Sequence, residues 1–387
     1  MRIPMQIMLV ILGCTALAGC SSLPAQGPSA SDVMSDAAPT DASGYEGYLV
    51  VDLDGRVADV LASRANATLV GRFGDHRPAP DTPIGIGDSV SVTIWEAAAG
   101  GLFSTPLSAS GSPGSRSAVI PEQVVARDGS ITVPYAGRLK VAGLATPVVE
   151  KRIVEALNGK AIEPQALVTV SKNISNTVTV TGEITTGARV PLSARGDRIL
   201  DVIASTGGLR APVHETFVSL SRGGRTATVP VQALLDRPAE NIYVRPGDTL
   251  TLVRDPQTFT AFGATGRNAV VPFDARGITL EEAVAKSGGL LDYQSDPSAV
   301  FLLRTESAEL ARRLDPNRPI PVGRQVVDVV YRVDLRNTNS FFLARRVMVQ
   351  NKDILYVANA PSTSIQKVLS VVQQAATPAV LAKTLTQ

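Results

Sequence analysis

The sequence predicts an α+β protein built from several consecutive domains, and two observations lead to this fold class. First, short strands with alternating apolar and polar residues follow tight glycine turns, as in Val90, Val92 and Ile94 after Gly87-Asp88. Second, a strand–turn–strand–helix segment occurs twice at a constant offset of 81 residues, which aligns Gly182 with Gly263. The chain has 387 residues, which is too long for one ordinary domain.

The N-terminus has the pattern of a bacterial export signal that ends in a cysteine. Arg2 precedes an apolar run over residues 7–12, and Leu-Ala-Gly leads directly into Cys20. This resembles the lipobox of bacterial lipoproteins, in which the cysteine receives several acyl chains and becomes a stable membrane anchor. The alternative is an ordinary cleaved signal in which Cys20 is incidental. We expect residues 1–19 to be a lipoprotein signal peptide and Cys20 to be lipidated. Serine, not aspartate, follows Cys20, which favours the outer membrane.

Composition excludes several classes of function. Cys14 lies in the signal and Cys20 at the anchor, so the mature chain offers neither a disulfide nor a cysteine metal site. The formal net charge of +2 argues against a nucleic-acid surface. His76 and His214 are expected to be surface residues, and no nucleophile elbow, phosphate loop or zinc-protease motif occurs. We therefore expect no catalytic residue, no metal site and no cofactor.

The part before the repeat is expected to hold a tether and one domain. Residues 20–44 are rich in Ser, Ala, Pro and Asp without periodicity, which is typical of a flexible tether. We assign residues 45–173 to the first domain. Within it we expect a strand at 48–53, an exposed loop at 97–122 and a helix at 147–157. Thr146 would cap that helix.

The internal repeat defines two further domains, residues 174–257 and 258–359. Pro191 aligns with Pro272, and the Gly-Gly-Leu that ends at Leu209 aligns with the one that ends at Leu290. Each copy is expected to give two strands, a helix stopped by glycine and a closing strand. Two copies indicate a compact α+β unit used twice, because a solenoid needs three or more.

Residues 360–387 are expected to form an amphipathic helix capped by Thr363 or Ser364. At 100° per residue its aliphatic and polar residues fall on opposite sides. A lone tail helix of this kind can pack on its own domain or on a partner. A ring of such helices could instead turn the aliphatic side to lipid and the polar side to a water-filled lumen. Pro378 should kink or end the helix. The predicted lipid-facing residues are Ile365, Val368, Leu369, Val372 and Ala376, and the predicted lumen-facing residues are Gln366, Ser370 and Gln373.

Together these segments resemble the outer-membrane polysaccharide export family, the Wza-like capsule exporters. Residues 84–95 (IGIGDSVSVTIW) and 125–143 (VARDGSITVPYAGRLKVAG) resemble the family's polysaccharide export domain. The two repeats resemble its tandem β-grasp domains of the SLBB type, and residues 356–361 with the tail resemble its membrane helix. The resemblance implies a homo-oligomeric ring, an octamer by analogy, whose C-terminal helices form an α-helical barrel.

The resemblance implies an outer-membrane conduit for capsular polysaccharide or exopolysaccharide, lipid-anchored and with most of the chain in the periplasm. Its partners would be outer-membrane lipid, the polymer, and an inner-membrane polysaccharide co-polymerase or ABC-type capsule exporter. One alternative is a non-pore periplasmic lipoprotein scaffold that binds sugar or protein through its β-grasp domains. Another is an enzyme that acts on polysaccharide, but the acidic residues show no spacing that indicates the required carboxylate pair.

Overall fold

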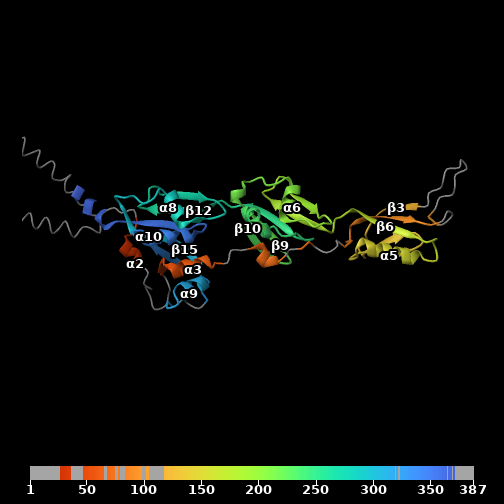
Figure 1. Cartoon of the computed structure of the whole chain (residues 1–387), viewed down its shortest axis with the longest axis horizontal. Coiled ribbons are helices and arrows are strands. Elements are labelled where there is room, and N and C mark those ends of the chain that lie inside the picture. Colours follow the sequence, from red (N-terminus) through yellow and green to blue (C-terminus); the bar gives the residue numbers. More distant parts are fainter. Residues whose placement is uncertain are drawn as a thin grey trace, which may run out of the picture. The chain divides into compact units, whose positions relative to one another are not determined.

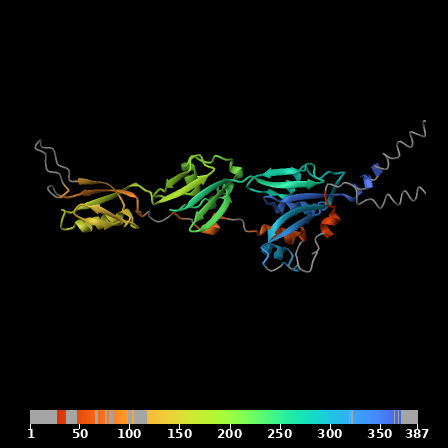
Figure 2. The same cartoon turned by 180° about the vertical axis from the view of Figure 1, so that it is seen from behind.

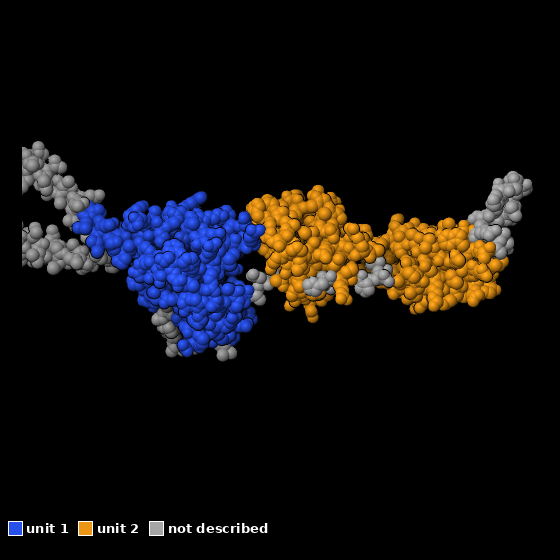
Figure 3. Space-filling view, viewed as in Figure 1, with its two compact units in different colours: residues 1–65, 256–387 blue, residues 66–255 orange. Residues whose placement is uncertain are grey.

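The computed structural model describes residues 27–35, 47–64, 68–74, 77–78, 83–97, 102–103, 117–318, 320, 323–363, 365–367 and 369–370. The chain forms two compact units (Figure 3). Unit 1 contains residues 1–65 together with 256–387, and unit 2 contains residues 66–255. Sheets and helices contribute to both units, which confirms the mixed α and β content.

Unit 2 contains a three-stranded antiparallel sheet covered by one helix. β2 (Ser89–Trp95) lies between β3 (Ser117–Val124) and β6 (Gln165–Lys172). Val90, Val92 and Ile94 are buried, as their alternation predicted, in a core shared with α5 (Thr146–Leu157) and the hairpin of β4 (Ser130–Val133) and β5 (Gly137–Lys140). β3 begins inside the expected loop. Ala145 is the N-cap of α5 and makes no side-chain cap, so Thr146 lies within the helix and the expected cap was wrong.

The first repeat folds as a five-stranded sheet in unit 2, with strand order β10-β9-β11-β7-β8. β7 runs parallel to β11, and every other neighbouring pair is antiparallel. The strands are β7 (Thr177–Gly182), β8 (Ala188–Pro191), β9 (Thr216–Arg222), β10 (Arg225–Pro230) and β11 (Thr249–Arg254). The helical segments are α6 (Ile199–Ser205), η2 (Val213–Glu215), α7 (Val231–Asp236) and η3 (Pro238–Glu240).

The second repeat, in unit 1, has the same strand order with one strand added: β1-β16-β15-β18-β12-β13. The parallel pair of the first repeat recurs as β12 and β18. The strands are β12 (Gln257–Gly263), β13 (Ala269–Phe273), β14 (Ile278–Thr279), β15 (Ser295–Ser307), β16 (Val326–Val333), β17 (Met348–Val349) and β18 (Ile354–Asn359). The helices are α8 (Leu280–Lys286), α9 (Ala308–Leu314) and α10 (Thr338–Arg346). This matching order supports duplication of one unit.

Two aligned glycines occupy equivalent places in the two sheets. Gly182 ends β7 opposite Leu252, and Gly263 ends β12 opposite Val357. Their φ angles are +97° and +89°. A Cβ atom would lie 1.9 Å from the carbonyl oxygen of Leu252 in the first case and 2.1 Å from that of Val357 in the second. Only glycine fits such a close backbone approach at positive φ, so the aligned glycines mark the same turn in both repeats.

The N-terminal segment packs on the repeats, and this corrects the expected boundary at residue 45. β1 (Leu49–Asp52) pairs in parallel with β16. α3 (Gly55–Ala62) contacts α9 and α10 (Figure 1), so both elements belong to unit 1. α4 (Leu69–Phe73) contacts β10 and η3 of the first repeat; Figure 2 shows it in orange beside the green strands. The apolar side chains of these elements are buried in the cores of the repeats, not in the core formed by β2 and α5.

Part of the expected tether is also structured. Residues 30–35 form α2 (Ala30–Ser35), and Val33 is buried on the outer face of the second repeat's sheet among Phe301, Val330 and Tyr356. Ser29 and Asp32 cap this helix reciprocally: the Ser29 N–H donates to Asp32 Oδ2 at 2.8 Å, and the Asp32 N–H donates to Ser29 Oγ at 3.2 Å. An apolar anchor and a capped start give these residues a fixed place, so the expectation of a tether over all of 20–44 was wrong.

Candidate functional site

The predicted tail helix starts where β18 ends. Residues 361–363, 365–367 and 369–370 are helical, so the helix begins at Pro361, before the expected caps Thr363 and Ser364. Its first turn is attached to the loop before β15: the Ala360 N–H donates to the carbonyl of Gln294 at 2.8 Å. A strand of the second repeat therefore continues almost directly into the helix.

The described part of the helix separates apolar from polar residues. Ile365 and Leu369 are 62% and 55% exposed and, four residues apart, share one side. Gln366 and Ser370 are also exposed and share the neighbouring side. Val368, Val372, Ala376 and Gln373 lie outside the described residues, as does Cys20. Among the described residues, no helix has the length and apolar content needed to cross a bilayer.

α2 is attached to the strand that leads into the tail. The Tyr356 hydroxyl donates to the carbonyl of Pro28 at 2.6 Å, and the Tyr48 hydroxyl donates to the carbonyl of Val33 at 2.7 Å. Phe301 stacks on Tyr356 with 6.3 Å between ring centroids. Burial, with a smaller effect of the Asp32 charge, raises the pKa of Tyr356, so its hydroxyl remains a donor at neutral pH. The N-terminal segment is thereby fixed to the last strand before the tail.

An open groove of about 720 Å³ lies beside α2 on the same sheet face. Its floor is largely apolar, and charged or polar side chains line part of it. Gly27, Pro28 and Val33 also line it. The sheet residues are Phe262, Leu303, Arg304, Thr305, Asp328, Val329, Val330, Lys352, Ile354 and Tyr356.

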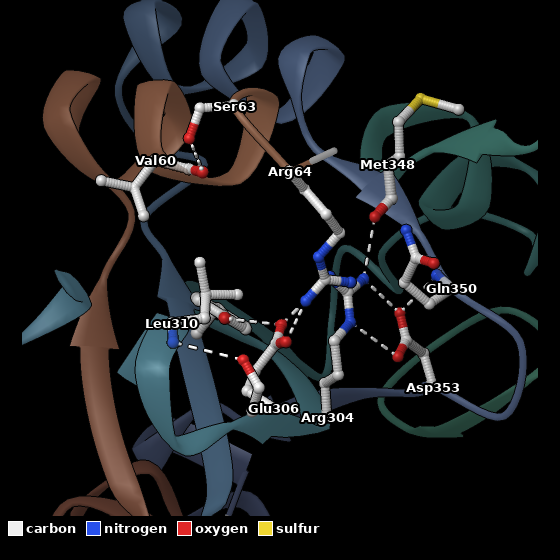
Figure 4. A network of polar contacts seen from close by, with 11 residues as sticks. Val60, Ser63, Arg64, Arg304, Glu306, Leu310, Met348, Gln350 and Asp353 are labelled. Atoms are coloured by element: carbon white, nitrogen blue, oxygen red, sulfur yellow. Dashed lines mark hydrogen bonds and ion pairs between the residues drawn. The ribbon is translucent and has the colours of Figure 1, made fainter. Parts of the chain in front are cut away.

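A buried charge network ties the N-terminal segment to the second repeat (Figure 4). Arg304 on β15 donates from Nε to Asp353 Oδ1 at 2.9 Å and from Nη2 to Asp353 Oδ2. Glu306 forms ion pairs with Arg304 and with Arg64, which follows α3. The Tyr331 hydroxyl donates to Glu306 Oε1 at 2.9 Å. Two arginines and two carboxylates balance the charge, as burial of ionic groups requires.

The network is suited to structure, not proton transfer. Burial raises the pKa of Tyr331, and the charge of Glu306 raises it further, so the phenol stays protonated. Burial alone would lower the pKa of Arg304, but its bonds to Asp353 raise it above the ordinary value. Neither Tyr331 nor Arg304 therefore changes its charge near neutral pH.

The first repeat contains the counterpart of the Arg304–Asp353 pair. Arg222 donates from Nε to Asp248 Oδ1 at 2.9 Å and from Nη2 to the carbonyl of Tyr243 at 2.9 Å. In the second repeat the same Nη2 contact goes to the carbonyl of Met348 at 2.8 Å. Phe73 of α4 lies 5.3 Å from the Arg222 guanidinium. The arginine of each repeat therefore lies against a different part of the N-terminal segment. Arg222 lies against Phe73 of α4, and the Arg304 network includes Arg64, which follows α3.

Candidate catalytic chemistry does not emerge from the described part of the chain. No group of three or more His, Cys, Asp or Glu side chains there could hold a metal ion. His214 is exposed on η2 and lies 3.9 Å from Glu215, while His76 falls outside the described residues. The docked helix α2 was not predicted from the sequence. The Ser-x-x-Asp pattern of Ser29–Asp32 is the signal that could have revealed its start.

Comparison with known proteins assigns two of these domains. Residues 76–171 match the family described as polysaccharide biosynthesis/export protein, and residues 257–357 match the SLBB domain. The chain is 37% identical over 367 residues to the capsule polysaccharide export outer membrane protein CtrA of Neisseria meningitidis serogroup B, covering 94% of this chain and 93% of the relative. It is 34% identical over 369 residues to the capsule polysaccharide export protein BexD of Haemophilus influenzae, covering 94% and 93%.

A more distant relative is the Vi polysaccharide export protein VexA/TviF of Salmonella typhi, 28% identical over 288 residues, which cover 74% of this chain and 76% of the relative. The similarity to CtrA and BexD extends through both compact units. The chain therefore belongs to the polysaccharide biosynthesis/export family, among the capsule polysaccharide export proteins.

Proposed function

We propose that this protein is a subunit of an outer-membrane conduit that exports capsular polysaccharide or exopolysaccharide. The observation that carries this proposal is the 37% identity to a capsule polysaccharide export outer membrane protein over 94% of the chain. A non-catalytic role agrees with the fixed, charge-balanced network at the second repeat. The energy for transport would come from an inner-membrane polysaccharide co-polymerase or an ABC-type capsule exporter.

The conduit would be a homo-oligomeric ring, an octamer by the family resemblance, with the C-terminal helices as an α-helical barrel. The exposed pair Ile365 and Leu369 supports this arrangement, because a helix with one uncovered aliphatic side needs lipid or a partner. Gln366 and Ser370 would then face a water-filled lumen. We assign the domains as residues 76–172 for polysaccharide export, and 177–255 and 257–359 for the two β-grasp domains.

Lipidation of Cys20 would hold the protein in the outer membrane, with most of the chain in the periplasm. Cys20→Ala should remove the lipid and leave precursor or mislocalised protein in the cell envelope. Metabolic labelling with a palmitate analogue, followed by membrane fractionation, measures this directly. Cys14→Ala is the matched control, because it changes the other cysteine within the signal. Equal labelling of Cys20→Ala and the wild type would show that the anchor lies elsewhere.

Deletion of the gene tests the function. The deletion strain should lose surface polysaccharide and retain polymer inside the cell, and the wild-type gene should restore export. Polymer is quantified on intact and on permeabilised cells. The second candidate is a periplasmic scaffold without a pore, favoured by the apolar groove beside α2. A monomer after mild detergent extraction would support the scaffold, and a ring with a lumen in electron micrographs would support the conduit.

A further inference from the structure

One face of the first repeat's sheet carries two rows of threonine and serine hydroxyls, beside an apolar row of Pro230, Phe217 and Val253. The strand registers align the hydroxyl residues across four strands. The first row contains Thr226, Ser221, Thr249 and Thr179, and the second contains Thr228, Ser219, Thr251 and Thr181. We call this set the hydroxyl face. All of its side chains are half-buried or exposed.

The opposite face of the same strands is the apolar core. Val178, Val180, Leu220 and Leu250 alternate with the hydroxyl residues and are fully buried. The position next to Thr179 on β8 is Arg189, which is exposed. Among the described strand positions on this face, Arg189 is the one charged residue, and it lies on β8, outside the two rows. The two rows themselves are uncharged.

The second repeat has apolar residues at most of the equivalent positions, although Thr260 replaces Thr179 and Arg332 replaces Thr228. Its registers place Ile354 where the first repeat has Thr249, and Tyr356 where it has Thr251. Leu303 and Phe301 replace Ser221 and Ser219 in the same way. That face is partly covered by α2 through Val33, whereas the side chains of the hydroxyl face are half-buried or exposed. The equivalent sheet face is therefore largely apolar and partly covered in the second repeat, and it bears hydroxyls in the first repeat.

A surface of short hydroxyls suits weak contact with a hydroxylated polymer. Each hydroxyl can donate and accept a hydrogen bond, as can the hydroxyls of a sugar. Threonine has few side-chain rotamers, so little entropy is lost on contact. A net hydrogen bond contributes little in water, and the sites are chemically similar along both rows. A chain could therefore move from one set of contacts to the next without leaving a deep site.

We propose that the hydroxyl face is the surface along which the exported glycan chain passes. This inference rests on the proposed export function and names the part of the protein that contacts the polymer. The occupant is a hydroxylated glycan. Uncharged hydroxyl rows match the hydrogen-bonding groups of a sugar better than they match an apolar protein surface. Thr228–Ser219 and Thr181–Thr251 bond to each other at 3.1 and 3.4 Å, and these bonds can exchange for contacts to a sugar.

Photo-crosslinking in cells tests contact directly. The photoreactive residue p-benzoylphenylalanine is placed at Thr251 of the full chain, in a deletion strain that produces polymer. Thr132, an exposed strand threonine outside the hydroxyl face, serves as the control position. Irradiation should give an adduct at position 251 that stains for polysaccharide, at least threefold stronger than at position 132. An adduct between two copies of the chain at 251 would overturn the proposal, because the face would then be a subunit contact.

Two matched triple variants test the need for the hydroxyls. Thr179→Val, Thr249→Val and Thr251→Val together remove hydroxyls with little change in shape, whereas serine at the same three positions keeps them. Cross-strand hydroxyl pairs also stabilise sheets, so protein level and thermal unfolding are measured for both variants. The valine variant should reduce surface polysaccharide at least threefold, and the serine variant should export near the wild-type level.

The outcomes separate this inference from the function on which it rests. If the deletion strain keeps normal surface polysaccharide, the export function itself is wrong. If deletion abolishes export but the valine variant exports normally and position 251 gives no glycan adduct, only the hydroxyl face is refuted. Should the valine variant fail to accumulate, the single-site crosslink at position 251 still decides the proposal.

Discussion

Three buried aspartates close the same turn before a strand. The carboxylates of Asp88, Asp248 and Asp353 each accept a hydrogen bond at 2.7 Å from the main-chain N–H three residues earlier. The residue before each aspartate has a positive φ: +89° at Gly87, +84° at Gly247 and +70° at Lys352. Glycine takes this conformation at no steric cost, whereas Lys352 takes it at a cost because its Cβ is crowded. The shared turn orients three different strands by one local device.

Acid titration of Asp88 provides the first prediction. Burial alone would raise the pKa of Asp88, but hydrogen bonds from Ser175, Gly85 and Ile174 outweigh it, so the pKa is lowered. Because the carboxyl of the unfolded chain titrates at about pH 4, these bonds stabilise the fold fully above that pH. Their contribution is lost as the pH falls through the lower, folded pKa. Asp88→Asn should therefore cost about 1–3 kcal/mol at pH 7 and progressively less in acid.

Trp95 gives a local readout for this prediction. It is the single tryptophan of the chain and lies on β2, the strand that follows the Asp88 turn. Denaturant unfolding followed by its fluorescence at pH 7 and at about pH 3 compares Asp88→Asn with the wild type. A free-energy difference that stays the same at both pH values would contradict the role assigned to the ionised carboxylate.

The close approach at Gly263 provides a second prediction. A Cβ there would overlap the carbonyl oxygen of Val357, whereas at Gly289, with φ +73°, it would meet no atom within 4 Å. Gly289→Ala should cost about 1 kcal/mol from backbone strain alone. Gly263→Ala should cost more, because β12 and β18 must separate or the turn must shift. Hydrogen exchange of peptides from β12 and β18 measures the difference, and equal protection in the two variants would rule out a special steric requirement at Gly263.

Sequence and structure agree where local chemistry decides an element. Aligned glycines identify the repeat, because a backbone position with positive φ favours glycine whatever its tertiary contacts. The alternation of apolar and polar residues identifies β2, because one face of that strand is buried. The partner of β1 could not be predicted, because its strand pattern specifies neither β16 nor a parallel register. The tail helix begins earlier than its expected caps, since the preceding loop is fixed by Gln294. The hydroxyl face could not be predicted, because it exists only in the register of four strands.

Docking of α2 combines hydrogen bonds from Tyr48 and Tyr356 with one buried side chain, and that side chain gives the third prediction. Val33 is 7% exposed, whereas its neighbour Met34 is 38% exposed on the same helix. Val33→Asp places a carboxylate among Phe301 and Tyr356 and should release residues 27–35. Met34→Asp introduces the same charge at a more exposed position and should leave α2 in place. Limited proteolysis detects release as rapid cleavage in this segment, and similar cleavage of both variants would show that Val33 does not hold the helix.

The N-terminal and C-terminal parts of the chain both belong to unit 1. The chain first contributes β1 and α3 to the second repeat, then α4 to the first repeat, and reaches β2 of the export domain only at Ser89. It then passes through the first repeat, the second repeat and the tail. The stretch between Cys20 and Gly27 is short, and the tail begins at Pro361. Both proposed membrane attachments therefore belong to unit 1, and Tyr356 bonds the N-terminal segment to the strand that continues into the tail.

The proposed barrel predicts opposite effects for one charge on two sides of the tail. Leu369→Arg would place a guanidinium in lipid, at about 2.5–3.5 kcal/mol per subunit on the translocon scale, and a ring repeats that penalty in every subunit. Gln373→Arg would place the same group in the aqueous lumen and should be tolerated. Surface polysaccharide is measured on cells that carry each variant, with protein level checked by blot. Export should fail for Leu369→Arg alone. The two variants should differ in export only if one side of the helix faces lipid. Equal export by both variants would therefore show that the helix does not span the membrane, and would favour the periplasmic scaffold.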